Sequence, residues 1–333
     1  MKYILGIEST AHTFGIAVLD EKGKILVNVK DSYSTESGGM IPMEVAEHHR
    51  EICDGLYGRA LEEAGIDEAE IFAVAFSNAP GLAPCLIEGM KFAKKIAGKL
   101  DVALVPVNHC IAHLEIGEIT GAKEPVLLYA SGANTQIIAY ESGKYRIFGE
   151  TLDMGVGNFI DTFARYAGLG FPGGPKIQKL ASECKNKKEL IDLSYSIKGM
   201  DVAFSGTLTK LRNFLEQKKY SIEDLSYSVQ EVVFAMLVEA AERALAHTGK
   251  KELLLGGGVG CNTRLQEMCK IMCKERGAKF FCPERSLLLD NPVMIGYLGL
   301  KMYKSGIFVK PAEMSNVDIA PRQRTDEVEV TWK

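Results

Sequence analysis

Two strand–turn–strand units, placed far apart in the chain, constrain its fold most strongly. In the first, the apolar runs YIL and GIAVL flank the polar turn GIESTAHT at residues 6–13; in the second, VLLY and QIIA flank SGANT at 131–135. Turns of small residues let backbone N–H groups and hydroxyls approach a phosphate, although an ordinary hairpin needs the same residues. The repetition predicts a duplicated protein of two lobes with a phosphate held between them.

The predicted elements follow the same duplicated order. Hydrophobic periodicity first predicts a three-stranded meander over 2–30, a helix over 43–64, a strand over 71–76, a helix over 87–99 and a strand over 102–107. It then predicts strands near 125–130, 135–140 and 145–149, helices near 156–167 and 175–184, a helical stretch over 206–247, a strand over 252–255, and helices over 262–273 and 290–304. This alternation is typical of an α/β protein with a mixed sheet in each lobe.

Composition indicates a globular protein with a substantial core. The 333 residues are 47% hydrophobic and 25% charged, which suits two domains of ordinary size. The net charge of −4 does not indicate nucleic-acid binding, so any such contact needs a local basic patch. Eight scattered cysteines without a C-x-x-C pair favour reduced thiols and a cytoplasmic setting. The apolar helix over 225–247 is interrupted by charges, which favours core packing over a membrane span.

The segment NHCIAH at 108–113 places two histidines four residues apart. If a helix begins after Asn108 as its N-cap, His109 and His113 share one face and can chelate a divalent metal. The zinc-protease motif has this spacing but needs Glu directly after the first His, where this chain has Cys110. Spacing alone leaves open the alternative of two histidines on a half-buried helix without a ligand.

A third segment, LLLGGGVGCNTR at 253–264, predicts a buried strand that runs through glycines into a helix beginning at Asn262. Glycine lets a base or ribose lie against the backbone, and a helix N-terminus favours anionic groups. The absence of a Lys-Ser/Thr ending excludes a Walker A loop, and the position is too late for a simple N-terminal Rossmann unit. A tight strand-to-helix turn without a ligand is the alternative.

Five motifs taken together resemble one known family over nearly the whole chain. They are IESTAH at 7–12, NHCIAH at 108–113, SGANTQ at 131–136, FPGGPK at 171–176 and RTDEV at 324–328. They resemble the catalytic subunit of the archaeal and eukaryotic KEOPS complex, which is homologous to bacterial TsaD and was formerly called O-sialoglycoprotein endopeptidase-like. The resemblance implies the actin-like ATPase (ASKHA) fold, with two ribonuclease-H-like lobes and a ligand cleft between them. The lobes would be 1–124 and 125–290, with a C-terminal helix and tail, 291–333, returning to the first lobe.

The resemblance also implies an activity. Members of the family transfer a threonylcarbamoyl group from threonylcarbamoyl-AMP to N6 of the adenosine 3′-adjacent to the anticodon, in tRNAs that read codons beginning with A. The implied cofactor is one divalent metal, iron or zinc with magnesium as the alternative, and the implied ligand is threonylcarbamoyl-AMP or another adenine nucleotide. The implied partners are tRNA and KEOPS subunits, including a small kinase/ATPase subunit and a small dimerising subunit, with no membrane.

Matched position by position, the motifs imply site residues. The metal ligands would be His109, His113 and Asp290, with Tyr129 beside them. The residues that contact the nucleotide would be Tyr129, Ala130, Ser131, Gly132, Ala133, Asp161, Gly174, Gln178 and Asn262. A carboxylate such as Asp161 can accept hydrogen bonds from both ribose hydroxyls. No residue stands out as a general base, so the catalytic residues stay unassigned.

The chain departs from the family pattern at several positions. Gln178 stands where Glu is usual. Ala133 replaces a glycine, and this replacement could crowd the ligand if the backbone there needs a positive φ. The remaining departures are alanine for glycine at Ala79 and Ala83, and Met43 and Ile87 where arginine is common. They motivate one alternative function, a non-catalytic paralogue that binds nucleotide and partners. A kinase of the same fold is another alternative, which would not need the histidine pair. A metallopeptidase is disfavoured by Cys110.

Overall fold

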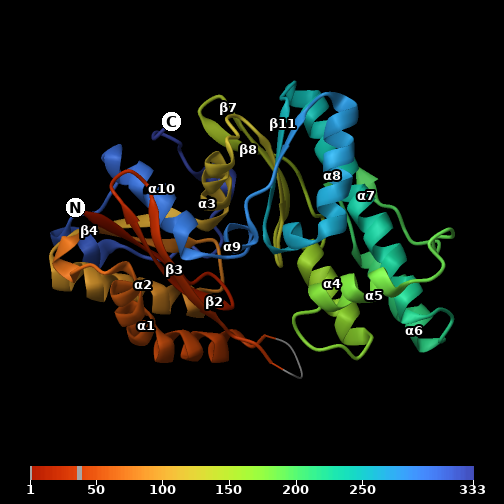
Figure 1. Cartoon of the computed structure of the whole chain (residues 1–333), viewed down its shortest axis with the longest axis horizontal. Helices are drawn as coiled ribbons and strands as arrows, with labels where there is room; N and C mark the ends of the chain where they lie inside the picture. Colours follow the sequence, from red (N-terminus) through yellow and green to blue (C-terminus); the bar gives the residue numbers. More distant parts are fainter. Residues whose placement is uncertain (1, 36–39) are drawn as a thin grey trace.

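The computed structural model describes residues 2–35 and 40–333, and within them the chain forms two five-stranded mixed sheets of the same topology (Figure 1). The first has the order β3-β2-β1-β4-β5 and the second the order β8-β7-β6-β11-β12. In each sheet three strands form an antiparallel meander, the fourth strand pairs in parallel with the first strand of that meander, and the fifth pairs in parallel with the fourth. The predicted duplication of an α/β unit is therefore confirmed.

The strands have the following bounds. The first sheet contains β1 (Tyr3–Glu8), β2 (Thr13–Asp20), β3 (Ile25–Ser32), β4 (Ile71–Ala79) and β5 (Ala103–Asn108). The second contains β6 (Val126–Ala130), β7 (Thr135–Glu141), β8 (Lys144–Glu150), β11 (Glu252–Gly256) and β12 (Lys279–Phe281). A small hairpin pairs β9 (Ile197–Lys198) with β10 (Asp201–Val202).

Helices cover both faces of the first sheet, and the helices of the second lobe pack on one face of the second sheet (Figure 1). On the first sheet, α1 (Pro42–Ala64) and α2 (Ala83–Leu100) pack on one face, and α3 (His109–Glu115) and α10 (Pro292–Lys304) pack on the other. The second sheet carries α4 (Val156–Tyr166), α5 (Gly174–Glu183), α6 (Ser205–Glu216), α7 (Ile222–Thr248) and α8 (Thr263–Arg276). Short helical segments are α9 (Arg285–Leu288), η1 (Glu68–Glu70), η2 (Ile116–Thr120), η3 (Gly258–Cys261), η4 (Pro311–Asn316) and η5 (Thr325–Glu327).

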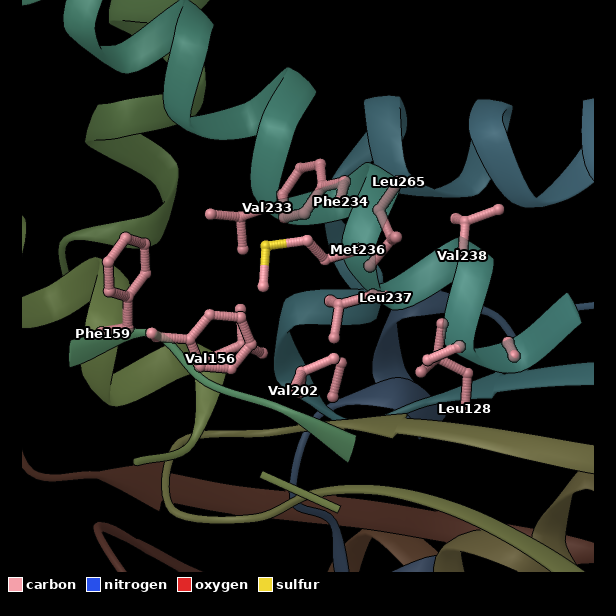
Figure 2. Packing of buried hydrophobic residues seen from close by; sticks show 14 of the residues in the cluster. Leu128, Val156, Phe159, Val202, Val233, Phe234, Met236, Leu237, Val238 and Leu265 are labelled. Atoms are coloured by element: carbon pink, nitrogen blue, oxygen red, sulfur yellow. The ribbon is translucent and has the colours of Figure 1, made fainter. Parts of the chain in front are cut away.

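Helix α7 is the centre of the second-lobe core. Figure 2 shows Phe234 and Leu237 of α7 packed among Leu128 of β6, Phe159 of α4 and Leu265 of α8. The predicted helical stretch over 206–247 is interrupted at 217–221, because Lys218 adopts a positive φ of 50° and the Ser221 hydroxyl accepts the Asp224 N–H to begin α7. In the described residues, no helix combines the length and apolarity that crossing a bilayer requires.

A separate hydrophobic cluster joins the two lobes. It contains Ile4 and Ala75 from the first sheet, Leu127 and Leu254 from the second, and Ile111 from α3, all fully or almost fully buried. The cluster encloses α3, so this short helix is held by both sheets at once.

The C-terminal segment packs first on one lobe and then on both. Helix α10 lies so close to β1 that a Cβ atom at Gly6 would be 2.4 Å from the Pro292 carbonyl oxygen. Beyond it, the chain reaches the second lobe, where Arg324 pairs with Glu150 at 3.2 Å and Glu329 bridges to Lys144 of β8. The boundaries expected at residues 124 and 290 stay a prediction.

The contact at Gly6 predicts a large effect of a single methyl group. We expect Gly6→Ala to lower the free energy of unfolding by about 1–3 kcal/mol, because the α10 backbone cannot move away without disturbing the interlobe core. Gly58→Ala is the matched control, since nothing lies within 4 Å of a Cβ at Gly58 on α1. That control should be neutral or stabilising by up to about 1 kcal/mol. Urea unfolding measures both, and equal stabilities of the two variants would contradict the assigned packing.

Candidate metal and nucleotide site

Helix α3 begins as the sequence predicted. The Asn108 side-chain oxygen accepts the N–H groups of Cys110 at 3.1 Å and Ile111 at 3.2 Å, which caps the helix. The helix then places His109 and His113 on one face, with ring centroids 4.7 Å apart. Both imidazoles are buried, so their ring nitrogens need partners within the protein or on a ligand.

The segment that precedes α10 brings Asp290 to these imidazoles. Its Oδ1 lies 3.3 Å from Nε2 of His109 and 3.4 Å from Nε2 of His113. The three ligand atoms lie within 4.8 Å of one another, and the group could hold a metal ion. Two imidazoles and a carboxylate are a common donor set for a transition metal with open coordination positions.

Glu8, at the end of β1, contacts the group of His109, His113 and Asp290, which we call the metal group. Its Oε2 lies 3.0 Å from Nδ1 of His109, and its Oε1 accepts the Thr10 N–H at 2.7 Å. A carboxylate that accepts the Nδ1–H leaves Nε2 free for a metal, as in carboxylate–histidine–metal arrangements. Glu8 was not predicted as a site residue, although the sequence carries a signal for it: an acidic residue ends an otherwise apolar strand, YILGIE.

The electrostatics of the metal group are strongly coupled. Burial lowers the pKa of His109, but attraction to Glu8 and Asp290 outweighs it and holds that pKa well above the usual value. Burial likewise opposes ionisation of Asp290, yet His109 and His113 hold its pKa well below the usual range. Burial and then the nearby His109 charge keep the pKa of His113 below its usual value. A metal ion would therefore replace a proton at His109.

Lys30 of β3 also lies at the site, although it was not predicted as a site residue. Its ammonium donates to the Asp290 carbonyl oxygen at 2.9 Å. Burial lowers the pKa of Lys30, while attraction to Asp290, Cys261 and Glu8 opposes that change. Lys30 therefore places a positive charge between the metal group and the glycine segment that ends at Cys261.

Tyr129 lies beside the metal group at the end of β6. Its side chain is buried, and its ring centroid is 5.0 Å from that of His113. Burial, followed by the nearby Cys110, raises the pKa of Tyr129 well above its usual value. The side chain is therefore a neutral phenol.

The predicted phosphate turn follows directly, with Ala130 buried at the end of β6. Ser131 closes the turn by donating its N–H to the Asn134 carbonyl oxygen at 2.9 Å. The start of α4 packs against it, because the Asn158 N–H donates to the Gly132 carbonyl oxygen at 2.9 Å. This approach needs glycine at 155, where a Cβ would be 2.3 Å from that oxygen.

Ala133 does not strain this turn. Among the described residues, the non-glycine residues with positive φ are Asp101, Ser142 and Lys218. The concern that Ala133 occupies a conformation suited to glycine is therefore wrong.

Asp161 and Gly174 come together below the turn. The Asp161 carboxylate accepts the Gly173 N–H at 2.7 Å, directly before Gly174 begins α5. Burial raises the pKa of Asp161, while that N–H and the nearby His12 oppose the rise. His12, from the first-lobe turn, also meets the Phe171 ring edge-on at 5.9 Å. The two lobes therefore face each other at this point.

The remaining predicted nucleotide residues bond to protein groups. The Asn262 oxygen caps α8 by accepting the Arg264 N–H at 2.9 Å, and its amide donates to Gln230 at 2.7 Å. The Gln178 amide donates to the Thr263 hydroxyl at 3.0 Å. These side chains therefore fix α5 and α8 relative to each other, and a ligand at Asn262 would meet mainly backbone.

The other departures from the family pattern lie on α1, β4 and α2. Met43 is 65% exposed on α1, and Ile87 is half-buried on α2. Ala79 is buried at the end of β4, and Ala83 begins α2.

Comparison with known proteins identifies the family. The profile of the TsaD family, described as tRNA N6-adenosine threonylcarbamoyltransferase, matches residues 24–297. The chain belongs to this family. It is 52% identical over 328 residues to the tRNA N6-adenosine threonylcarbamoyltransferase of Thermococcus kodakarensis, covering 98% of this chain and 99% of the relative. It is 51% identical to a probable bifunctional tRNA threonylcarbamoyladenosine biosynthesis protein of Methanosarcina mazei, covering 99% of this chain and 59% of the relative. These matches confirm the predicted family and its transferase activity.

Solved structures of more distant proteins support the fold. Full-length HypF has a TM-score of 0.62 at 12% identity, over 92% of this chain and 56% of HypF. The activator of 2-hydroxyisocaproyl-CoA dehydratase from Clostridium difficile has a TM-score of 0.54 at 11% identity, over 94% of this chain and 96% of that one. The actin-like fold predicted from the motifs is confirmed.

The metal group predicts a simple change in stoichiometry. We expect His113→Ala to abolish tight binding of a divalent transition metal, because one of the three ligand side chains is lost. His247→Ala is the control, since His247 is an exposed histidine on α7. Elemental analysis after metal loading and desalting gives the metal content, and full occupancy in His113→Ala would refute the assigned ligands.

Proposed function

We propose that this protein transfers the threonylcarbamoyl group of threonylcarbamoyl-AMP to N6 of the adenosine 3′-adjacent to the anticodon, in tRNAs that read codons beginning with A. The observation that carries the proposal is the group of His109, His113 and Asp290 at the junction of the two lobes, in a chain that matches its transferase relatives from end to end. A kinase of the same fold would have no use for this group.

We assign one divalent metal to His109, His113 and Asp290, with Tyr129 beside it. Imidazole donors suit iron or zinc, whereas magnesium prefers oxygen ligands. When bound, such an ion would supply Lewis-acid polarisation of a donor oxygen. Glu8 contributes by holding His109 in the tautomer whose Nε2 faces Asp290.

We place the adenosine part of the donor on the second lobe. In the described part of the chain, the N–H groups of Gly132 and Ala133 donate no hydrogen bond, so both are free to bind a phosphate. Asp161 can accept ribose hydroxyls with the carboxylate oxygen that Gly173 leaves free. The threonylcarbamoyl end then points toward the metal group, and the site acts mainly by holding donor and acceptor together.

The reaction needs one bond to form and one to break. The N6 amine of the acceptor adenosine attacks the carbamoyl carbon, the bond to the phosphate oxygen breaks, and AMP leaves as the amine loses a proton. The chain contributes binding and orientation, and we assign no side chain as the base. The adenine of the acceptor nucleotide must unstack from the neighbouring bases of the anticodon loop to reach the junction of the lobes.

We propose that KEOPS-type partners complete the enzyme in the cytoplasm. The chain carries a net charge of −4, and Met43 and Ile87 stand where cationic residues would strengthen contact with tRNA. Additional basic surface must therefore come from other subunits.

The decisive experiment combines the chain with the purified KEOPS-type subunits, threonylcarbamoyl-AMP and unmodified tRNA. Mass spectrometry of the digested tRNA should show threonylcarbamoyladenosine, and the double variant His109→Ala/His113→Ala should show none. Wild-type protein that leaves the tRNA unmodified in every combination, yet binds nucleotide and partners, would instead support the non-catalytic alternative.

The role given to Asp161 predicts a loss of nucleotide affinity. We expect Asp161→Ala to weaken AMP binding by about 1–3 kcal/mol, because hydrogen bonds from the ribose hydroxyls to a carboxylate are lost. Asp192→Ala removes a highly exposed carboxylate, paired with Lys210, and serves as the control. Calorimetry compares them, and unchanged AMP affinity in Asp161→Ala would remove this residue from the site.

The need for partners predicts weak activity of the isolated chain. We expect it to bind tRNA weakly and with only a small dependence on salt, because few of its own cations can contact phosphates. Adding the partner subunits should raise both tRNA affinity and transfer rate, measured by filter binding and by the modification assay. Rapid multiple turnover by the chain alone would show that no partner is required.

A further inference from the structure

We infer that Lys30 binds the α-carboxylate of the threonyl group in the donor, and so selects an acyl group that carries a carboxylate. This inference rests on the proposed function and deepens it. Lys30 belongs to β3 of the first lobe, whereas the turn assigned to the phosphate follows β6 of the second lobe.

The hydrogen bonding of Lys30 leaves room for a ligand. Its ammonium has three N–H donors, and across residues 2–35 and 40–333 it makes one hydrogen bond, to the Asp290 carbonyl oxygen at 2.9 Å. That bond holds the ammonium beside the metal group without neutralising it, because a carbonyl carries no net charge. The other two donors can therefore bind an anion that lies over Asp290.

The charges around Lys30 favour such an anion once a metal is present. Glu8, Asp290 and Lys30 together leave one surplus negative charge when both imidazoles are neutral. A divalent ion would change this to one surplus positive charge. In a partly desolvated site an unbalanced charge is costly, so a ligand that brings one negative charge to this point is favoured.

The position of Lys30 selects the carboxylate over the phosphate. The phosphate is assigned to the backbone of Gly132 and Ala133 on the second lobe, and the donor extends from there toward the metal group. Beyond the carbamoyl carbon, the group of the donor that is charged at neutral pH is the threonyl carboxylate. The threonyl carboxylate is therefore the anion that reaches the first lobe, where the Lys30 ammonium has N–H groups without an acceptor in the part of the protein that the structure describes.

The test compares ligands that differ by one charge. The first is a hydrolysis-resistant analogue of threonylcarbamoyl-AMP, the second is the same analogue with its carboxylate replaced by a carboxamide, and the third is AMP. Calorimetry with metal-loaded protein gives each dissociation constant. We expect wild type to prefer the carboxylate analogue over the carboxamide by roughly tenfold to a hundredfold, as for a charged hydrogen bond.

Three variants make the comparison specific. Lys30→Met should lose the preference for the carboxylate while binding AMP as wild type does, and Lys30→Arg should retain most of it. Lys94→Met is the matched control. Lys94 of α2 is also half-buried, and its ammonium also donates to a backbone carbonyl oxygen, that of Val317, at 2.6 Å. It should leave every dissociation constant unchanged.

Each contrary outcome has a distinct meaning. If Lys30→Met weakens AMP as much as the carboxylate analogue, Lys30 binds the phosphate and the inference is overturned. If the Lys30→Met variant loses its metal, or still prefers the carboxylate analogue over the carboxamide, Lys30 is not the residue that binds the carboxylate. If wild type binds neither analogue while still binding AMP, the proposed donor itself is wrong, and the inference fails with it.

Discussion

Burial of α3 between the two sheets is the constraint on which the candidate site depends. The helix is only seven residues long, and all of its residues are buried. A helix so short has little stability of its own, so packing from both lobes must hold it. Burial also removes water from two imidazoles, and the cost is large unless polar groups of the protein or a ligand replace it. Glu8 of β1 and Asp290, which precedes α10, provide carboxylate oxygens close to the nitrogens of the two imidazoles.

The far end of α3 is held by a buried carboxylate. Glu115, whose side chain is not exposed, accepts hydrogen bonds from Tyr145 of β8 and from the Trp332 indole at 3.0 Å, and it pairs with Lys301 of α10. Burial opposes the charge, but Lys333 and Lys301 keep the pKa of Glu115 below its usual value. The C-terminal residues therefore fix the position of α3, two residues after His113, by contacts with both lobes.

The parts of this protein that could be predicted from sequence are those encoded by local patterns. The Asn108 cap, the shared face of His109 and His113, and the turn after β6 each follow from residues only a few positions apart. Asp290 could be assigned only through the family resemblance, because it lies 177 residues from His113. Glu8 and Lys30 escaped prediction for the same reason: their roles come from contacts that only the packing of β1, β3 and α10 creates. Strand β12 was missed because its three residues are too few to show a period.

The duplicated topology explains why these distant residues meet. In each sheet a helix connects the fourth strand to the fifth, and a helical segment follows the fifth strand: α3 after β5, and α9 with Asp290 after β12. The proposed metal ligands therefore come from equivalent places in the two repeats, which face each other across the junction of the lobes.

The turns after β1 and β6 are also equivalent, but their residues differ in kind. The first presents charged and hydroxyl side chains at Glu8 and Thr10, and the second presents backbone N–H groups at Gly132 and Ala133. Side chains can ligate or orient an ion, whereas free N–H groups suit a phosphate. One fold, used twice with different turn residues, can thus hold the two ends of one donor.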